Sequence, residues 1–214
     1  MRVSIDCVHC YLKQAVSCMK MGGIDEDAQH EILYKLMDYV KGFDRTATPA
    51  ENSTHVVLKT YELMKNDDPF KEAKRQSNDL ALQLYPRLKE LIDENGDRLY
   101  KAFRISVAGN IIDLGIRRSF NIDEELKYSM EIGFAKEQYR DFVKKLDQVD
   151  EVLFLGDNSG EIVFDKILVE ELARLGKEVT YVVKEGPILN DATMEDAVYV
   201  GMDKVTRVIT TGSR

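Results

Sequence analysis

The chain has 214 residues, 44% hydrophobic and 32% charged, which excludes a disordered tail, a collagen-like repeat and a disulfide-built miniprotein. Its net charge of −8 disfavours nucleic-acid binding, because phosphate contacts need clustered Lys and Arg. No apolar run approaches the roughly 20 residues that cross a bilayer, and the N-terminus lacks a secretory apolar stretch. Three cysteines, an odd number, fit a reducing compartment. We expect a cytoplasmic globular protein without nucleic-acid or membrane partners, and its oligomeric state stays open.

The first 148 residues read as an all-helical domain. Apolar side chains recur three and four positions apart, and alternating β-branched stretches are almost absent. Pro86 is expected to kink or break the fourth helix. The predicted helices cover residues 6–21, 27–41, 50–65, 70–94, 97–118 and 123–133.

Residues 149–214 change to an α/β pattern. Short apolar strands at 152–155, 179–183 and 205–210 alternate with helices at 161–175 and 193–200. This βαβαβ order predicts a Rossmann-like parallel sheet with right-handed crossovers. Three strands make a thin sheet with poorly covered apolar edges. Either the helical part covers these edges, or a partner does, or the sequence is a fragment. We expect a fragment, with the α/β domain truncated.

The loop after the first predicted strand, GDNSGE at 156–161, is dense in polar groups and runs straight into a helix. Ligands bind at the carboxyl ends of strands in such sheets. Asp157 and Asn158 supply oxygen ligands that suit Mg²⁺, Mn²⁺ and related ions. The backbone N–H groups around Ser159 and Gly160 would seat an anion. The alternative is an ordinary Asp or Asn cap on the helix; the loop matches no nucleophile-elbow, dinucleotide or Walker motif.

The loop after the second predicted strand, residues 184–193, carries a further acid, Asp191. If the two strands are adjacent, Asp191 lies beside Asp157 and Asn158, and the three side chains would form an oxygen-rich metal site. Alternatively, Asn190 or Asp191 simply starts the next helix.

A polar stripe runs along the otherwise apolar helix predicted at 97–118. Its members Ser106, Asn110, Asp113 and Arg117 are spaced i, i+4, i+7 and i+11, so they share one face. The stripe could face the sheet's loops and bind substrate. It could equally be the helix's solvent face, or contain a self-satisfied Asp113–Arg117 pair.

Cys7 and Cys10 have the C-x-x-C spacing of zinc or redox sites, but the sequence has no second such pair, and Cys18 leaves the ligand count short. Packing of small residues on a helix explains the spacing equally well.

Four ordered motifs together resemble the metal-dependent damage-control phosphatases, a family that includes the acidic-residue methyltransferase-like proteins. They are the early C-x-x-C, AGNIID at 108–113, GDNSGE at 156–161 and NDAT at 190–193. The resemblance covers essentially the whole chain and is greatest to the archaeal-type branch with N-terminal cysteines. Family members continue into further strands and a Lys-Gly-x-Gly-Asn segment beyond the position of Arg214.

The resemblance implies a helical domain with a Rossmann-like α/β domain and a divalent ion, Mn²⁺, Co²⁺, Ni²⁺ or Mg²⁺, at the carboxyl edge of the sheet. It places the family's metal ligands, which are also the expected catalytic residues, on Asp157, Asn158 and Asp191. It also implies that the AGNIID helix contributes Asn110 and Asp113 to the site.

We therefore expect a metal-dependent phosphatase that hydrolyses small phosphorylated metabolites, such as sugar phosphates or damaged cofactor precursors. The nucleophile, a water molecule or one of the carboxylates, is left open. The alternatives are an S-adenosylmethionine-dependent carboxyl methyltransferase, for which Glu185 would be the ribose-binding acid, and a non-catalytic metal-binding or interaction module. The expected substrate-binding residues are Asn110, Asp113, Ser159, Gly160, Glu161 and Lys184.

Overall fold

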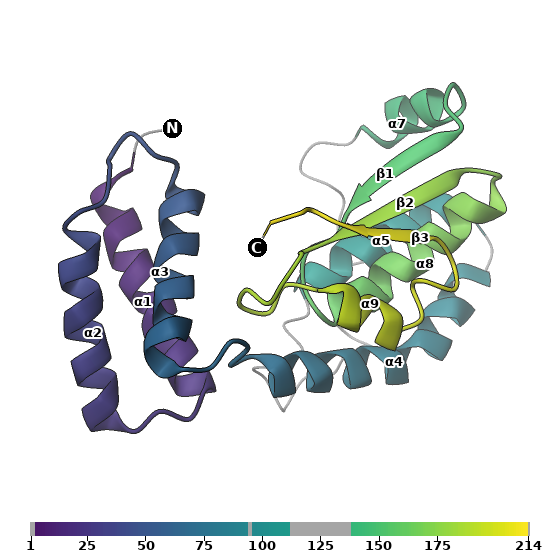
Figure 1. The fold of residues 1–214 in the computed structure, drawn as a ribbon. Helices are drawn as coiled ribbons and strands as arrows, with labels where there is room; N and C mark the ends of the chain where they lie inside the picture. The colour runs from purple at the N-terminus through teal and green to yellow at the C-terminus, as the bar shows by residue number, and fades with distance from the viewer. Residues whose placement is uncertain (1–2, 94–95, 112–137, 214) are drawn as a thin grey trace. The chain divides into compact units, whose positions relative to one another are not determined.

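A computed structural model describes residues 3–93, 96–111 and 138–213 (Figure 1). These residues form two compact units. One runs to Ala73 and includes the loop segment Gly186–Asn190, and the other comprises Lys74–Glu185 and Asp191–Ser213. This division differs from the expected boundary at 148/149, because the chain from Lys74 onward belongs to the same compact unit as the sheet.

The first unit is built from α1 (Ile5–Met21), α2 (Glu26–Val40) and α3 (Pro49–Met64). Asp25 caps α2 by accepting the N–H of Ala28 at 2.9 Å, and the Thr48 hydroxyl caps α3, whose first residue is a proline. The segment Gly186–Asn190 joins this unit through Leu189, whose N–H donates to the Tyr61 hydroxyl at 2.9 Å. The apolar core of the unit includes Tyr11, Ala15, Cys18, Met19, Ile32, Leu36, Val56, Val57 and Ile188.

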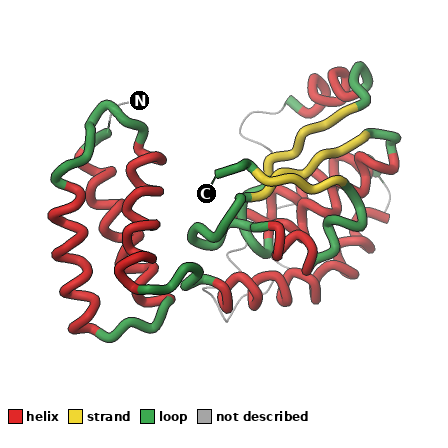
Figure 2. Tube along the Cα trace, viewed as in Figure 1, coloured by secondary structure: helices red, strands yellow, loops and turns green. Residues whose placement is uncertain are grey.

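The second unit contains a parallel sheet in the order β1-β2-β3, as the βαβαβ pattern predicted (Figure 2). Its strands are β1 (Glu151–Leu155), β2 (Glu178–Val183) and β3 (Arg207–Thr210). The crossovers contain α8 (Glu161–Arg174) and α9 (Met194–Tyr199). Within the described ranges, Leu153 and Leu155 of β1 stay 64% and 70% exposed, in line with the expected poor cover of the sheet.

Helices α4 (Lys71–Asp93), α5 (Arg98–Ile111) and α7 (Tyr139–Leu146) complete the described elements of the chain. Of these, α5 packs closely on α8 because Gly109 leaves no side chain there: a Cβ at Gly109 would lie 2.8 Å from the Cβ of Phe164. The glycine of the AGNIID motif therefore allows the contact between two helices. The apolar core of this unit, to which both helices contribute, includes Ala102, Ile105, Ala108, Ile162, Val163, Phe164, Ile167 and Tyr181.

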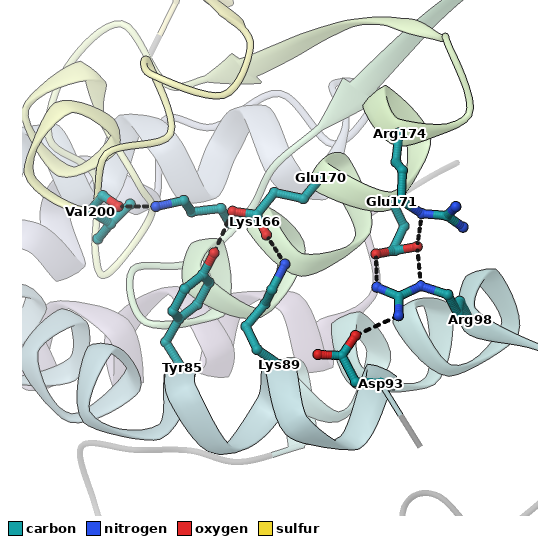
Figure 3. A network of polar contacts seen from close by, with 9 residues as sticks. All are labelled: Tyr85, Lys89, Asp93, Arg98, Lys166, Glu170, Glu171, Arg174 and Val200. Atoms are coloured by element: carbon teal, nitrogen blue, oxygen red, sulfur yellow. Dashed lines mark hydrogen bonds and ion pairs between the residues drawn. The ribbon is translucent and has the colours of Figure 1, made fainter. Parts of the chain in front are cut away.

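Ion pairs join α8 to α4 and α5 (Figure 3). The buried Glu171 carboxylate accepts two hydrogen bonds from Arg98, at 2.7 and 3.1 Å, and one from Arg174 at 2.8 Å. Burial alone would raise the pKa of Glu171, but the two guanidinium groups hold it below its ordinary value. Lys89 of α4 pairs with Glu170 at 2.6 Å. These ion pairs hold α8 in place, and the polar loop at 156–161 leads directly into the N-terminus of this helix.

α4 runs without a break through Pro86, because tertiary packing of its apolar face outweighs the one backbone hydrogen bond that the proline removes. α7 was not predicted from the sequence. The helix expected at 123–133 lies outside the described residues. No described helix has the length and apolarity needed to cross a membrane.

Candidate metal and phosphate site

The two polar loops meet at the carboxyl ends of β1 and β2. Asn158 and Asp191 form an isolated antiparallel bridge, and the N–H of Ala192 donates to the carbonyl oxygen of Asp157 at 2.7 Å. The N–H of Lys184 in turn donates to the Ala192 carbonyl at 3.0 Å. The loops therefore hold each other by backbone hydrogen bonds, and the structure brings together the residues predicted as metal ligands.

The helix caps at this edge are provided by other residues. Gly160, with a φ of 83°, is the N-cap of α8, and no side chain caps that helix. Thr193 is the N-cap of α9, and its N–H donates to the Asp196 carboxylate at 2.9 Å. The capping interpretation of the three predicted metal ligands is therefore wrong, and their side chains are left for another role.

The carboxylates at this edge repel one another. Burial raises the pKa of Asp191 to about 6, and the charge of Asp157 acts in the same direction. Lys184 opposes the shift, because its ammonium lies 3.5 Å from the Asp191 carboxylate. Crowded, partly buried carboxylates of this kind are what a bound cation would neutralise.

Glu161 and Asn110 lie at the rim of the same loop. Burial raises the pKa of Glu161, whose Oε2 accepts hydrogen bonds from the side-chain amides of Asn158 and Asn110, both at 3.2 Å. Asn110 of α5 thus faces the loop, which is the substrate-facing alternative for the polar stripe and the one that the family resemblance implies. The other expected residue of that helix, Asp113, lies outside the described residues.

The Ser159 hydroxyl and the Gly160 N–H differ in whether they have a hydrogen-bond partner. The Ser159 hydroxyl is buried and has no hydrogen-bond partner among the described residues, so it is available to a ligand oxygen. The N–H of Gly160 instead donates to the Oδ1 of Asn78 at 2.7 Å. The expected anion seat is therefore corrected at this position, because the Gly160 amide is already satisfied.

Asn78 is a site residue that the sequence did not reveal. It lies on α4, is 1% exposed, and its side-chain amide also donates to Asp196 at 2.9 Å. Lys74, one turn earlier and 4% exposed, has its ammonium 3.6 Å from the same carboxylate. The i, i+4 spacing puts both on one helix face, but polar residues in a charged amphipathic helix gave no reason to single them out.

A buried hydrogen-bonded group lies beneath the first loop. The Asp165 carboxylate accepts from the Ser106 hydroxyl at 2.5 Å and from the Tyr181 hydroxyl at 2.7 Å. Burial raises the pKa of Asp165 to about 7. Ser106, which the polar stripe offered as a substrate-facing residue, is used here inside the protein.

Asp165 gives a pH-dependence of stability with a definite sign. Its folded pKa of about 7 lies above its ordinary 3.8, so the folded state holds the proton more tightly than the unfolded chain. This contribution is complete below pH ~4 and is lost as the pH rises through ~7, at up to about 1.4 kcal/mol per pH unit. Asp165→Asn should remove it.

Urea unfolding of the wild type and Asp165→Asn at pH 5 and pH 8 measures this difference. The free energy of unfolding of the wild type should fall further between the two pH values than that of the variant. Equal falls in both proteins would contradict the assignment.

The donor set fits a hard divalent cation. Two carboxylates and an amide provide only oxygen ligands, and the amide nitrogen of Asn158 donates to Asp157 at 3.2 Å, which directs its oxygen elsewhere. No group of three or more His, Cys, Asp or Glu side chains that could hold a metal occurs in the described ranges. An ion at this edge would therefore need the amide oxygen or water in addition to the two aspartates.

The cysteines lie in the helical unit. Cys18 is fully buried in its core. Cys7 is half-buried, with its sulfur 3.4 Å from the Ser4 hydroxyl, and Cys10 is exposed, so packing does not account for Cys10.

Comparisons with known proteins agree with the motif pattern. An uncharacterised protein of Methanocaldococcus jannaschii is 33% identical, over 99% of this chain and 72% of its own length. A damage-control phosphatase of Pyrococcus horikoshii is 29% identical, over the whole chain and 75% of its own length. The crystal structure of a DUF89 family protein from P. horikoshii matches with a TM-score of 0.90 at 29% identity, covering 100% of this chain and 75% of that one. Residues 3–214 match the model of the damage-control phosphatase ARMT1-like domain, and the chain belongs to that family.

Proposed function

We propose that this protein is a divalent-metal-dependent phosphatase of small phosphorylated metabolites. The observation that carries the proposal is the meeting of Asp157, Asn158 and Asp191 where two adjacent parallel strands end. Membership of a damage-control phosphatase family supports it, as does the relative from P. horikoshii that is named as such an enzyme. The family is in general dependent on a divalent metal ion.

In this proposal the oxygens of Asp157, Asn158 and Asp191 hold the ion, which is Mn²⁺, Co²⁺, Ni²⁺ or Mg²⁺. When bound, a divalent cation polarises the phosphoryl group and offsets the charge that develops during its transfer. The two carboxylates, which repel each other in the protein alone, provide the negative charge that keeps the cation in place.

The remaining site residues bind and orient the substrate. Ser159 offers a buried hydroxyl without a described partner, which can donate to a phosphate oxygen. Lys184 lies 3.5 Å from Asp191 and would offset phosphate charge. Glu161 and Asn110, hydrogen-bonded to each other, would orient water or the organic part of the substrate. Gly160 contributes its positive φ to the turn, and Asp113 keeps its predicted role in substrate binding.

The alternatives have less support. The methyltransferase interpretation needs Glu185 for a ribose, but its carboxylate is hydrogen-bonded to the Thr210 hydroxyl. The name of the P. horikoshii relative favours phosphate hydrolysis over methyl transfer. The buried, unpartnered hydroxyl of Ser159 favours a site that takes a ligand over a purely structural module.

Release of inorganic phosphate from a panel of sugar phosphates tests the proposal. The purified protein should lose its activity in a chelator and recover it when one of the four ions is added back. Phosphate release that persists undiminished in the chelator would contradict the metal dependence. No release with any of the four ions would contradict the phosphatase assignment.

A further inference from the structure

One side chain, Asn78 of α4, makes a direct hydrogen bond to the first loop of the site. Its Oδ1 accepts the Gly160 N–H at 2.7 Å, and both groups are buried. Gly160 is the N-cap of α8 and has a positive φ, so the backbone of the loop turns sharply at this residue. A buried N–H without an acceptor is costly, and Asn78 therefore fixes the position of the turn that follows Asp157 and Asn158.

The same side chain also reaches the segment that follows the second loop. Its amide nitrogen donates to Oδ1 of Asp196 at 2.9 Å. The other oxygen of Asp196 accepts from both the N–H and the hydroxyl of Thr193, at 2.9 and 2.8 Å. Thr193 stands two residues after Asp191, so Asn78 is connected to both ligand loops through short buried contacts.

These contacts act against an electrostatic force. Asp157 and Asp191 are both acids on loops that their backbone contacts hold together, and like charges held close together repel each other when no cation lies between them. Backbone hydrogen bonds from Ala192 and at the Asn158–Asp191 bridge hold the loops together on one side. Asn78 adds a connection from α4, whose Lys74 also places positive charge near Asp196.

We propose that Asn78 is a positioning residue of the metal site, which bridges the two ligand loops and preorganises them for a divalent ion. The inference rests on the proposed function, because it assumes that these loops bind the metal. Residues that orient metal ligands from behind typically change affinity by about 10–100-fold when they are replaced.

The two hydrogen bonds of Asn78 can be tested by exchanging the side chains at positions 78 and 196. Asn78→Asp keeps an oxygen for the Gly160 N–H but sets one carboxylate against another at the present 2.9 Å contact. Asp196→Asn removes the acceptor that Asn78 uses, unless its amide turns away from Thr193. In the double variant, the new amide at 196 can donate to the new carboxylate at 78 and still accept from Thr193, while the negative charge stays near Lys74.

Mn²⁺ binding, followed by the electron paramagnetic resonance signal of the free ion, is the primary measurement. Each single variant should bind Mn²⁺ about 10–100-fold more weakly than the wild type, and the double variant should recover most of the loss. At saturating Mn²⁺ the kcat of the variants should fall less than their Mn²⁺ affinity, because the ion then holds the loops. Asp196→Asn and the double variant keep the test open if Asn78→Asp does not fold.

Asn52→Asp is the matched control. Asn52 is a 4% exposed asparagine of the helical unit whose amide donates to the Asp44 carbonyl at 3.3 Å. Its replacement should lower stability and leave the Mn²⁺ affinity at the wild-type value.

The possible failures are distinct. The role of Asn78 would be overturned by a wild-type Mn²⁺ affinity in either single variant. It would also be overturned if the double variant bound Mn²⁺ no more tightly than the single variants. Equal loss of Mn²⁺ affinity in Asn52→Asp would overturn it too, because the effect would then be one of general stability. A wild-type protein that binds no Mn²⁺ would overturn the proposed metal site and the inference with it.

Discussion

Replacement of Asp157 by asparagine is expected to lower metal-dependent phosphate release by about 10²–10³-fold or more, the usual cost of losing a group that stabilises charge in the transition state. The side chain keeps its shape, but the site loses one of its two anionic ligands. Phosphate release from the best sugar phosphate, measured over a range of Mn²⁺ concentrations, tests this. Full recovery at high Mn²⁺ would show that Asp157 contributes only to metal affinity.

The same substitution should leave folding intact. Asp157 is exposed, and its charge raises the pKa of Asp191, so its removal relieves repulsion in the metal-free protein. We expect an unfolding midpoint in chelator equal to or slightly above that of the wild type. Cys7→Ser in the helical unit is the control and should keep the wild-type rate. Equal loss of activity in both variants would place the chemistry at the other end of the chain.

Gly156→Ala should give the largest loss of stability among substitutions near the site. A Cβ at this position would lie 2.3 Å from the Tyr181 hydroxyl and 2.5 Å from its ring. Tyr181 cannot yield easily, because it is fully buried, stacks on Phe154 and donates to Asp165. Overpacking of this kind costs about 1–3 kcal/mol, or a fall of roughly 2–4 °C in Tm per kcal/mol for a chain of this length.

Thermal unfolding followed by circular dichroism checks this expectation, with Gly42→Ala as the control. A Cβ at Gly42 would meet only the Tyr39 carbonyl oxygen at 3.5 Å, an ordinary contact, so its Tm should barely change. Gly156→Ala should also impair phosphate release, because the ligand loop begins at this residue. An unchanged Tm in Gly156→Ala would contradict the close packing beneath the loop.

The strands and the two ligand loops could be predicted because their information is local. An apolar run that ends in Gly156 marks a strand, although Leu153 and Leu155 of that strand are exposed in the structure. The residues after strands in a parallel sheet meet at one edge whatever the details of packing. The strands and loops needed only the period of the pattern and the direction of the strands. Helical periodicity put Asn110 on a polar stripe without deciding which way the stripe faces; its place in the site was implied by the family resemblance.

The contacts around the loops could not be predicted because they join residues far apart in the chain. Asn78 lies 82 positions from Gly160, whose N–H it accepts, and Ser106 lies 59 positions from Asp165. Nothing in the local sequence separates such a buried polar residue from one on a solvated helix face. The unbroken course of α4 through Pro86 has the same origin, since long-range packing overrides a local preference.

The most direct test of the metal site is its position in a crystal grown with Mn²⁺. Data collected near the manganese absorption edge should give one strong anomalous peak within coordination distance, about 2.0–2.6 Å, of oxygens from Asp157, Asn158 and Asp191. A peak elsewhere, for example at Cys7 and Cys10, or no peak at these three residues in crystals of a protein that binds Mn²⁺ in solution, would contradict the account.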